Sequence, residues 1–213
     1  MYTGIVQTVA PVTRLERHEG HTSFTFELPP ERLADLQIGG SVAVEGVCLS
    51  ATAIEGTRVS FDAMTATLER TNLARLEEGG RANIERSMKM TEENGGHPVA
   101  GHISCTAELV ALKTEGAGAF ITFRVPQPWA KYVFDRGFLA VNGCSLTVAE
   151  AEGDLFTIYL IPETLRQTTF PDYKVGDHVN IEVDHQTKIT VDVMERTLER
   201  LLPQYLGKAG AAA

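Results

Sequence analysis

The chain has 213 residues, of which 43% are hydrophobic and 22% are charged, and its formal net charge is −9. This composition is typical of a globular protein, and the negative charge argues against nucleic acid or an anionic membrane surface as a partner, because both attract clustered lysine and arginine. Three cysteines without a CxxC pair argue against a disulfide framework, and no apolar run reaches the roughly 18 residues that span a membrane, so we expect a cytoplasmic protein.

The first half of the chain reads mainly as strands. A short helix is expected over 30–36, where a proline and an acidic residue open the segment. Alternating apolar and small residues over 41–54 predict a strand, which is followed by a turn at 55–57 and another strand over 58–62.

After residue 62 the pattern changes from strand to helix. The segment 67–73 predicts a turn of helix that leads to a turn at Gly79, and residues 86–97 read as a linker. The same order then recurs, as a short helix over 128–134, strands over 139–151 and 155–160 joined by a turn at 152–154, and a helical turn over 164–170. Glycine and proline recur about every 8–12 residues, as in sandwiches and barrels. A closed barrel is expected in each half, because closure leaves no exposed sheet edge.

The segment after Asp184 has no counterpart in the first half. Apolar residues recur there at three- and four-residue spacing, from Val193 to Tyr205, with charged residues opposite, which predicts an amphipathic helix over 188–206. Such a helix packs on its own chain or joins subunits, and its pattern is compatible with both. Residues 207–213 are expected to form a flexible tail.

The two halves match each other without a gap when the chain is shifted by 97 positions, so that Gly4 falls on Gly101. Under this shift residues 46–50 fall on 143–147. Solenoid repeats are about 20–50 residues long, so a shift of this length indicates a duplicated domain instead. We expect one domain over 1–97 and a second over 98–187.

Familiar catalytic motifs are absent from the sequence. It has no dinucleotide-binding glycine loop, no Walker loop, no Gly-x-Ser-x-Gly elbow and no HExxH motif. His97 and His102 lack a cysteine or carboxylate at ligand spacing, so we expect no metal site.

Differences between the two copies are candidates for chemistry. The aligned pairs are Cys48 with Ser145, Ile5 with His102, Ser87 with Asp184, and Gly39 with Arg136. Taken singly, Cys48 reads as a small buried hydrophobe, His102 as a structural histidine and Asp184 as a solvated turn carboxylate. Together they indicate two similar pockets, one with a thiol and the other with a hydroxyl, an imidazole and a candidate carboxylate.

Six segments resemble the riboflavin synthase family in order and spacing. They are residues 1–6, 46–50, 95–103, 142–148, 161–165 and 179–184. The resemblance implies an all-β fold of two tandem Greek-key β-barrels, each a lumazine-binding domain, and a C-terminal amphipathic α-helix that joins three chains into a homotrimer.

The resemblance also implies a transferase reaction of riboflavin biosynthesis. Two molecules of 6,7-dimethyl-8-ribityllumazine exchange a four-carbon unit and give riboflavin and 5-amino-6-(D-ribitylamino)uracil. No cofactor or metal is implied, since the pteridine ring delocalises the carbanion that forms at the C7 methyl group. The implied site lies between the N-terminal barrel of one subunit and the C-terminal barrel of the next. An association with lumazine synthase is left open.

The binding residues are carried over from this resemblance. In the N-terminal barrel they are Gly4, Ile5, Val6, Cys48, Leu49, Ser50, Asp62, Ala63, Met64, Thr65, Ala66 and Thr67. In the C-terminal barrel they are Gly101, His102, Ile103, Arg136, Ser145, Leu146, Thr147, Tyr159, Leu160, Ile161, Pro162, Glu163 and Thr164.

Catalytic roles are assigned as hypotheses on the same basis. His102 and Thr147, with Ser145, are expected to assist removal of a C7 methyl proton or to stabilise the resulting anion. Cys48 or Ser145 is expected to add to C7 of the partner lumazine or to position a water there. The two remaining expected catalytic residues are Asp184, as a distal charged helper, and Tyr2, which stacks or orders the N-terminal strand over the pocket.

Two other functions compete with this interpretation. A non-catalytic, antenna-type lumazine- or flavin-binding protein would have the same fold, but the pockets of such proteins are degraded in one barrel, whereas both copies here keep polar residues. A flavin-dependent reductase needs an additional nicotinamide domain with a phosphate-binding loop, for which the chain has no room.

Overall fold

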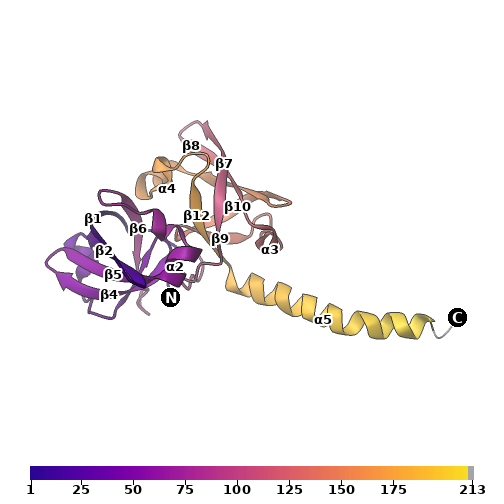
Figure 1. The fold of residues 1–213 in the computed structure, drawn as a ribbon. Helices are drawn as coiled ribbons and strands as arrows, with labels where there is room; N and C mark the ends of the chain where they lie inside the picture. Colours follow the sequence, from indigo (N-terminus) through magenta and orange to yellow (C-terminus); the bar gives the residue numbers. More distant parts are fainter. Residues whose placement is uncertain (211–213) are drawn as a thin grey trace.

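The structure is a computed structural model that describes residues 1–210, with side chains described as far as residue 203. Two closed six-stranded antiparallel barrels are followed by a long helix. Figure 1 shows the two barrels side by side, with the helix extending from them. The predicted fold class, all-β with two tandem barrels and a C-terminal helix, is therefore confirmed.

The N-terminal barrel is built from the first repeat. Its strands are β1 (Thr8–His18), β2 (His21–Glu27), β3 (Ser41–Val44), β4 (Val47–Glu55), β5 (Arg58–Met64) and β6 (Arg81–Arg86), in the closed order β1-β2-β5-β4-β3-β6. The short helices are α1 (Pro30–Leu33), α2 (Thr65–Arg70) and the 3-10 turn η1 (Asn72–Arg75). Every second residue of β5 is buried, with Val59 and Phe61 in the core, as expected for a strand with one face inside a barrel.

The C-terminal barrel repeats this order 97 residues later. Its elements are β7 (Cys105–Glu115), β8 (Gly118–Arg124), α3 (Gln127–Ala130), β9 (Phe138–Val141), β10 (Cys144–Glu152), β11 (Leu155–Leu160), α4 (Pro162–Gln167), η2 (Phe170–Asp172) and β12 (His178–Val183). The neighbours of each strand are the same as in the first barrel.

The run 41–54, predicted as one strand, is two strands joined by a tight hairpin at Glu45 and Gly46. Both residues have positive φ, 49° and 78°, as a two-residue hairpin turn requires. The second repeat has the same turn at Asn142 and Gly143. The two turns touch, since a Cβ atom at Gly46 would lie 2.6 Å from the Gly143 nitrogen.

A buried polar network joins the barrels around these turns. Glu45, 1% exposed, accepts hydrogen bonds from the Tyr173 hydroxyl (3.0 Å) and the Asn83 backbone N–H (2.6 Å). At the equivalent position, the Asn142 side-chain oxygen accepts from the Asn180 backbone N–H (2.7 Å). The repeats therefore meet about an approximate twofold axis, with a carboxyl group on one side and an amide on the other.

The C-terminal helix α5 (His185–Gly210) projects away from both barrels (Figure 1). It begins three residues before the predicted start at 188 and continues through 207–210, part of the segment expected to be a tail; residues 211–213 of that segment lie outside the described residues. Within the described part of the chain, no helix is both long and apolar enough to cross a membrane.

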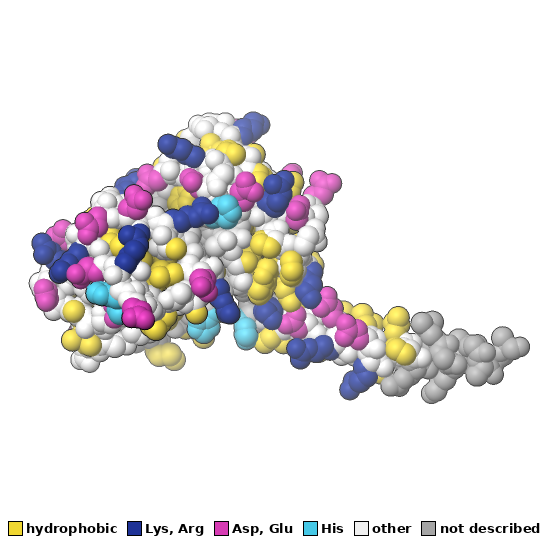
Figure 2. All heavy atoms as spheres, in the orientation of Figure 1, with side chains coloured by type: hydrophobic (Ala, Val, Ile, Leu, Met, Phe, Trp, Pro, Cys, Tyr) yellow, Lys and Arg dark blue, Asp and Glu magenta, His cyan; other side chains and the backbone are white. Residues whose placement is uncertain are grey.

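The first turns of α5 are attached to Lys131 and Tyr132, the residues directly after α3. Asp192 accepts a hydrogen bond from the Tyr132 hydroxyl (2.5 Å), and Lys131 pairs with Glu195. The helix also exposes apolar side chains, both beside this attachment and beyond it, and some of them are visible in Figure 2. The exposed apolar residues of α5 are Ile189, Val193, Met194, Leu198 and Leu202.

Candidate functional site

The leading segments of the two repeats each reach the opposite barrel. The Gly4 carbonyl accepts a hydrogen bond from the Ser145 backbone N–H (2.7 Å), and the Gly101 carbonyl accepts one from the Cys48 backbone N–H (3.0 Å). Each segment stays attached to its own barrel through a buried glutamate, because Glu85 accepts from the Gly4 N–H (3.0 Å) and Glu182 accepts from the Gly101 N–H (2.8 Å). We call this arrangement the reciprocal segment exchange.

Glycine is required where each leading segment reaches the opposite barrel, at Gly4 and at Gly101. We call these two places the crossing points. Gly4 has φ +74°, and a Cβ atom there would lie 2.5 Å from the Ser145 Cβ. Gly101 has φ +81°, and its Cβ would lie 2.5 Å from the Cys48 Cβ. Positive φ and this close approach both exclude a larger side chain.

Because of the reciprocal segment exchange, two sets of expected binding residues lie beside the other barrel from the one expected. Residues 4–6 were expected beside Cys48 in the N-terminal barrel, but the structure places them beside Ser145. Residues 101–103 lie instead at the N-terminal barrel, where Gly101 contacts Cys48 and Ile103 packs against the core. The physical reason is that each segment pairs by backbone hydrogen bonds with the first residues of β4 or β10 in the other repeat, a contact that alignment of the repeats does not reveal.

A cleft of about 390 Å³ opens where residues 4–6 meet the second barrel. We call it the C-barrel cleft. It brings together six of the expected binding residues, Gly4, Ile5, Val6, Ser145, Glu163 and Thr164. Arg32 and Gln7 of the first repeat also line it, together with Gln167 of α4, and none of these three was expected from the sequence.

Ser145 pairs with a histidine that sequence reasoning did not assign to the site. His97 Nδ1 lies 2.6 Å from the Ser145 Oγ, and the His97 ring, 5% exposed, stacks on Phe138 with centroids 5.4 Å apart. Burial lowers the pKa of His97, and the charge of Asp184 opposes that shift. A histidine with a lowered pKa is neutral near pH 7 and can accept a proton.

From the sequence, His97 was weighed only as a metal ligand and was not connected with Ser145. It follows Gly95 and Gly96 in one of the segments that carry the family resemblance. A Cβ atom at Gly96 would lie 2.7 Å from the Ser145 Cβ, so this glycine lets the segment pass directly over Ser145. The sequence feature that could have pointed to His97 as a site residue is its position directly after two glycines, which allow a close backbone approach.

Cys48 is paired with an aromatic hydroxyl. The Tyr2 hydroxyl donates to the Cys48 Sγ (3.1 Å), and Tyr2 is 1% exposed. Burial, followed by the bond to Cys48, raises the pKa of Tyr2, so the phenol stays protonated and remains a donor. Tyr2 is fixed by two backbone hydrogen bonds with Val99, of 2.7 and 3.0 Å. Tyr2 therefore orients the thiol beside the second repeat's leading segment.

Three expected residues are exposed on the surface of the chain. His102 is exposed and its backbone N–H donates to Glu182 (3.0 Å). Thr147 is exposed on β10, and Arg136 is exposed at a left-handed turn with φ 60°. In the described residues no hydrogen bond joins His102 to Thr147. Asp184 accepts from the Thr187 N–H (2.7 Å) at the start of α5.

The remaining expected binding residues divide into buried and accessible positions. Leu49, Leu146, Ala63 and Leu160 are buried in the barrels, whereas Ser50, Met64, Thr65, Ala66, Tyr159, Ile161 and Pro162 are exposed and Thr67 is half-buried. Asp62 accepts a hydrogen bond from the Ser23 hydroxyl (2.6 Å).

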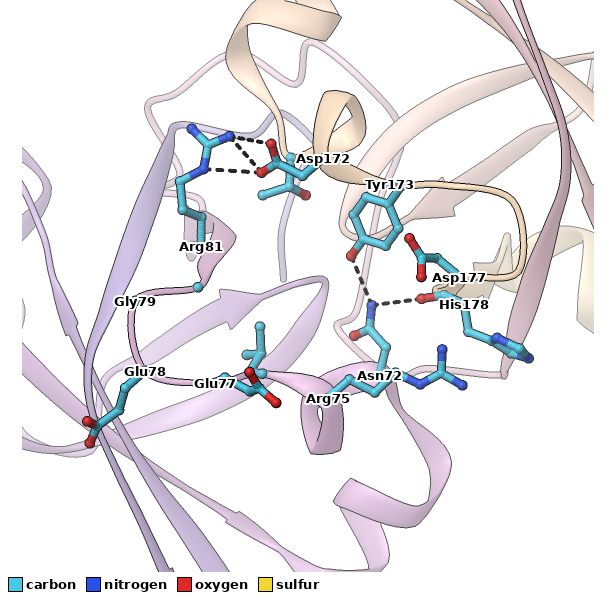
Figure 3. Close-up of a pocket in the computed structure, with 13 residues that line it drawn as sticks. Asn72, Arg75, Glu77, Glu78, Gly79, Arg81, Asp172, Tyr173, Asp177 and His178 are labelled. Carbon is cyan, nitrogen blue, oxygen red and sulfur yellow. Dashed lines mark hydrogen bonds and ion pairs between the residues drawn. The ribbon is translucent and has the colours of Figure 1, made fainter.

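A second cleft, of about 460 Å³, lies on the approximate twofold axis between the barrels (Figure 3). Equivalent segments of the two repeats, within 72–81 and 169–178, line it. Arg81 bridges it through a bidentate pair with Asp172, and Asn72 donates to the Tyr173 hydroxyl (3.3 Å) at its floor. This cleft is larger than the C-barrel cleft, but it contains none of the expected site residues.

The described residues contain no group of three or more histidine, cysteine, aspartate or glutamate side chains arranged to hold a metal ion. The three cysteines, Cys48, Cys105 and Cys144, are free thiols. Each crossing point has one pair of polar groups. The Cys48 thiol is paired with the Tyr2 phenol, and the Ser145 hydroxyl is paired with the His97 imidazole.

Known proteins are similar to this chain over nearly its whole length. The family described as lumazine binding domain matches residues 3–87 and 100–184. The chain is 43% identical to the riboflavin synthase of Escherichia coli (strain K12) over 93% of each chain, and 36% identical to that of Chlamydia pneumoniae over 93% of this chain and 97% of the other.

Solved structures agree on the fold. LumP complexed with 6,7-dimethyl-8-(1'-D-ribityl) lumazine superposes with a TM-score of 0.79 at 22% identity, and LumP complexed with riboflavin with a TM-score of 0.81 at 22% identity. Each alignment covers 87% of this chain and 100% of the other.

Proposed function

The chain belongs to the riboflavin synthase family, with a lumazine binding domain in each repeat, and from that premise we propose how its two barrels carry out the reaction. By homology its activity is that of riboflavin synthase, EC 2.5.1.9. The substrate we infer is 6,7-dimethyl-8-ribityllumazine, two molecules of which yield riboflavin and 5-amino-6-(D-ribitylamino)uracil.

The observation that carries this proposal is the reciprocal segment exchange. It gives both barrels the same backbone edge, from 4–6 or from 101–103, against which the same ring can bind. It also places a different nucleophile at each edge, Ser145 in one and Cys48 in the other. Two identical reactants can therefore be held alike and still be treated differently. Holding them in a fixed orientation supplies much of the rate enhancement for a bimolecular reaction.

Ser145 lines the C-barrel cleft and His97 is hydrogen-bonded to it, and this pair is suited to move a proton. A neutral His97 accepts the Ser145 hydroxyl proton while Ser145 accepts one from the C7 methyl group or activates a water. The electron pair of the broken C–H bond delocalises into the pteridine ring. Asp184 stabilises the imidazolium that forms, in line with its opposing effect on the pKa of His97.

The exposed expected residues support a site completed by a neighbouring subunit. His102, Thr147 and Arg136 lie on the surface, where a second chain can meet them. The N-terminal barrel of one subunit would then face the C-terminal barrel of the next, with Cys48 and Ser145 on opposite sides of the two stacked lumazines.

We propose that α5 holds three such chains together. Its apolar residues are exposed in the single chain, and burying them on equivalent helices removes that surface from water. The three free thiols support a reducing compartment such as the cytoplasm. An association with lumazine synthase stays a prediction from family membership.

A turnover assay separates this function from simple lumazine binding. The protein is mixed with excess 6,7-dimethyl-8-ribityllumazine, and riboflavin is followed by absorbance. We expect riboflavin to accumulate over many turnovers, with one riboflavin formed for every two lumazines consumed. A fluorescence change that saturates at stoichiometric ligand, without riboflavin, would instead show a binding protein of the antenna type.

A further inference from the structure

Two arginines of the first repeat have no arginine at the matching position of the second. Under the shift of 97 residues, Arg32 falls on Trp129 and Arg86 falls on Val183. Among the described residues, the Nε atoms of these two arginines are the buried side-chain nitrogen or oxygen atoms that lack a hydrogen-bond partner. A buried donor without a partner is destabilising, so its presence calls for an explanation.

Arg86 fixes the helix that carries Arg32. From β6, its Nη1 donates to the backbone carbonyls of Arg32 (2.6 Å) and Ala34 (3.3 Å). These carbonyls are at the C-terminal end of α1, where backbone acceptors otherwise lack partners. Arg86 is thus a positioning residue for Arg32.

Arg32 lines the C-barrel cleft although it belongs to the first repeat. The other charged residue of this cleft, Glu163, is already engaged by Arg166 (2.5 Å) and Gln167 (3.0 Å). No carboxylate in the described part of the chain lies within ion-pair distance of Arg32. The guanidinium is therefore the uncompensated charge of the cleft.

We propose that Arg32 is a ligand-binding residue of the C-barrel cleft, where its guanidinium donates hydrogen bonds to carbonyl oxygens of the pyrimidinedione ring of a bound lumazine or flavin. This inference rests on the proposed function, which places a pteridine beside Ser145. Such a ring presents carbonyl oxygens, and the planar guanidinium offers five N–H donors in a fixed geometry and accepts no hydrogen bonds. The matching residue of the second repeat, Trp129, has a single N–H donor and cannot supply this contact to the other barrel.

The test is an equilibrium titration of the full-length protein with riboflavin, the product, followed by quenching of flavin fluorescence. Two binding sites per chain are expected in the parent. Arg32→Gln is expected to weaken one site about tenfold or more, the loss typical of a hydrogen bond to a charged group, and to leave the other unchanged. Arg32→Lys keeps the charge and should retain part of the affinity.

Two further variants separate binding from folding. Arg86→Gln is expected to weaken the same site, since it releases the end of α1, while Arg75→Gln is a matched control because Arg75 is exposed and lines the other cleft. In turnover assays, Arg32→Gln should raise KM for the lumazine while kcat changes less than about threefold. Equal thermal midpoints for Arg32→Gln and Arg75→Gln would show that the fold is retained.

Several results would overturn the inference. It is wrong if Arg32→Gln leaves every riboflavin site at parental affinity, or if it weakens all sites to the same extent. A parent protein that forms no riboflavin would contradict the proposed function first. If the parent forms riboflavin normally and Arg32→Gln binds and reacts like the parent, the proposed function stands and only the binding role of Arg32 is wrong.

Discussion

The Ser145 hydroxyl oxygen lies 2.6 Å from Nδ1 of His97, two residues that come from different segments and meet only because Gly96 permits the approach. His97 is buried and its pKa is lowered, so the imidazole is neutral near pH 7. A neutral imidazole beside a hydroxyl is the arrangement of a general base and the group it activates.

Removing the base should lower turnover far more than binding. We expect His97→Gln to reduce kcat by about 10²–10⁴-fold, the usual contribution of a general base, with a smaller change in KM. Riboflavin formation from 6,7-dimethyl-8-ribityllumazine measures both constants. Ser145→Ala should have a similar effect, and the double variant should be no worse than either alone if the two residues act as a unit. Turnover within twofold of the parent in both single variants would exclude this role.

The crossing glycine should be intolerant of even one methyl group. Gly4→Ala places a Cβ atom 2.5 Å from Ser145 Cβ at φ +74°, whereas Gly56→Ala has φ +61° with nothing within 4 Å. Gly56→Ala is the control, and it should lose about 1–2 kcal/mol of unfolding free energy because an alanine adopts the left-handed backbone conformation unfavourably. Gly4→Ala should lose about 1–3 kcal/mol more from overpacking. Urea unfolding measures the difference, and equal losses would show that Ser145 moves aside freely.

The buried carboxyl group of Glu45 should make stability depend on pH. Burial raises its pKa to about 7, above the ordinary value of 4.5, although its hydrogen bonds, first of all the one from the Asn83 N–H, oppose the shift. A group with a raised folded-state pKa stabilises the protein fully below its unfolded pKa, and this contribution is lost as pH rises from about 4.5 through about 7.

Glu45→Gln tests this dependence, because the equivalent Asn142 shows that an amide fits at this position. Between pH 4.5 and 8 the parent should lose on the order of 3 kcal/mol of unfolding free energy relative to the variant, since a tenfold change in proton affinity corresponds to about 1.4 kcal/mol. Denaturant unfolding at several pH values measures it. A constant difference between the two proteins across this range would show that the pKa of Glu45 is ordinary.

Charges on the apolar side of α5 should separate the subunits. Val193→Glu combined with Leu198→Glu places carboxylates on residues that are more than half exposed in the single chain. If α5 joins three chains, sedimentation should shift from trimer to monomer and riboflavin formation should fall with it. Glu199→Lys, an exposed charge change on the same helix, should leave both unchanged. A parent that sediments as a monomer with full activity would contradict the proposed trimer.

The fold could be predicted from the sequence because both the 97-residue repeat and the alternating strand pattern can be read directly from the order of the residues. It joined β3 and β4 into one strand because the first repeat has Glu45 before the glycine; the matching Asn142-Gly143 is a strong hairpin signal and was available 97 residues later. The start of α5 was missed by three residues, which is close to the usual uncertainty of helix ends.

The site could be predicted only in part, because its key contacts join distant segments. Cys48 and Ser145 were visible as a difference between the copies. Their contacts with Tyr2 and His97 were not, since each of these two reaches its partner from a segment far away in the chain. Alignment of the repeats compares equivalent positions, whereas the structure pairs Gly4 with Ser145 rather than with its own repeat's Cys48.

The reciprocal segment exchange has a consequence for any attempt to divide the molecule. A first repeat produced alone would carry the segment that it lends to the other barrel and would lack the one that covers Cys48. A second copy of that fragment could supply the missing segment, so the isolated repeat should form a homodimer with two equivalent clefts. The tandem repeat thus holds, within a single polypeptide, the kind of interface that a symmetric dimer has, and Cys48 and Ser145 occupy its two equivalent positions.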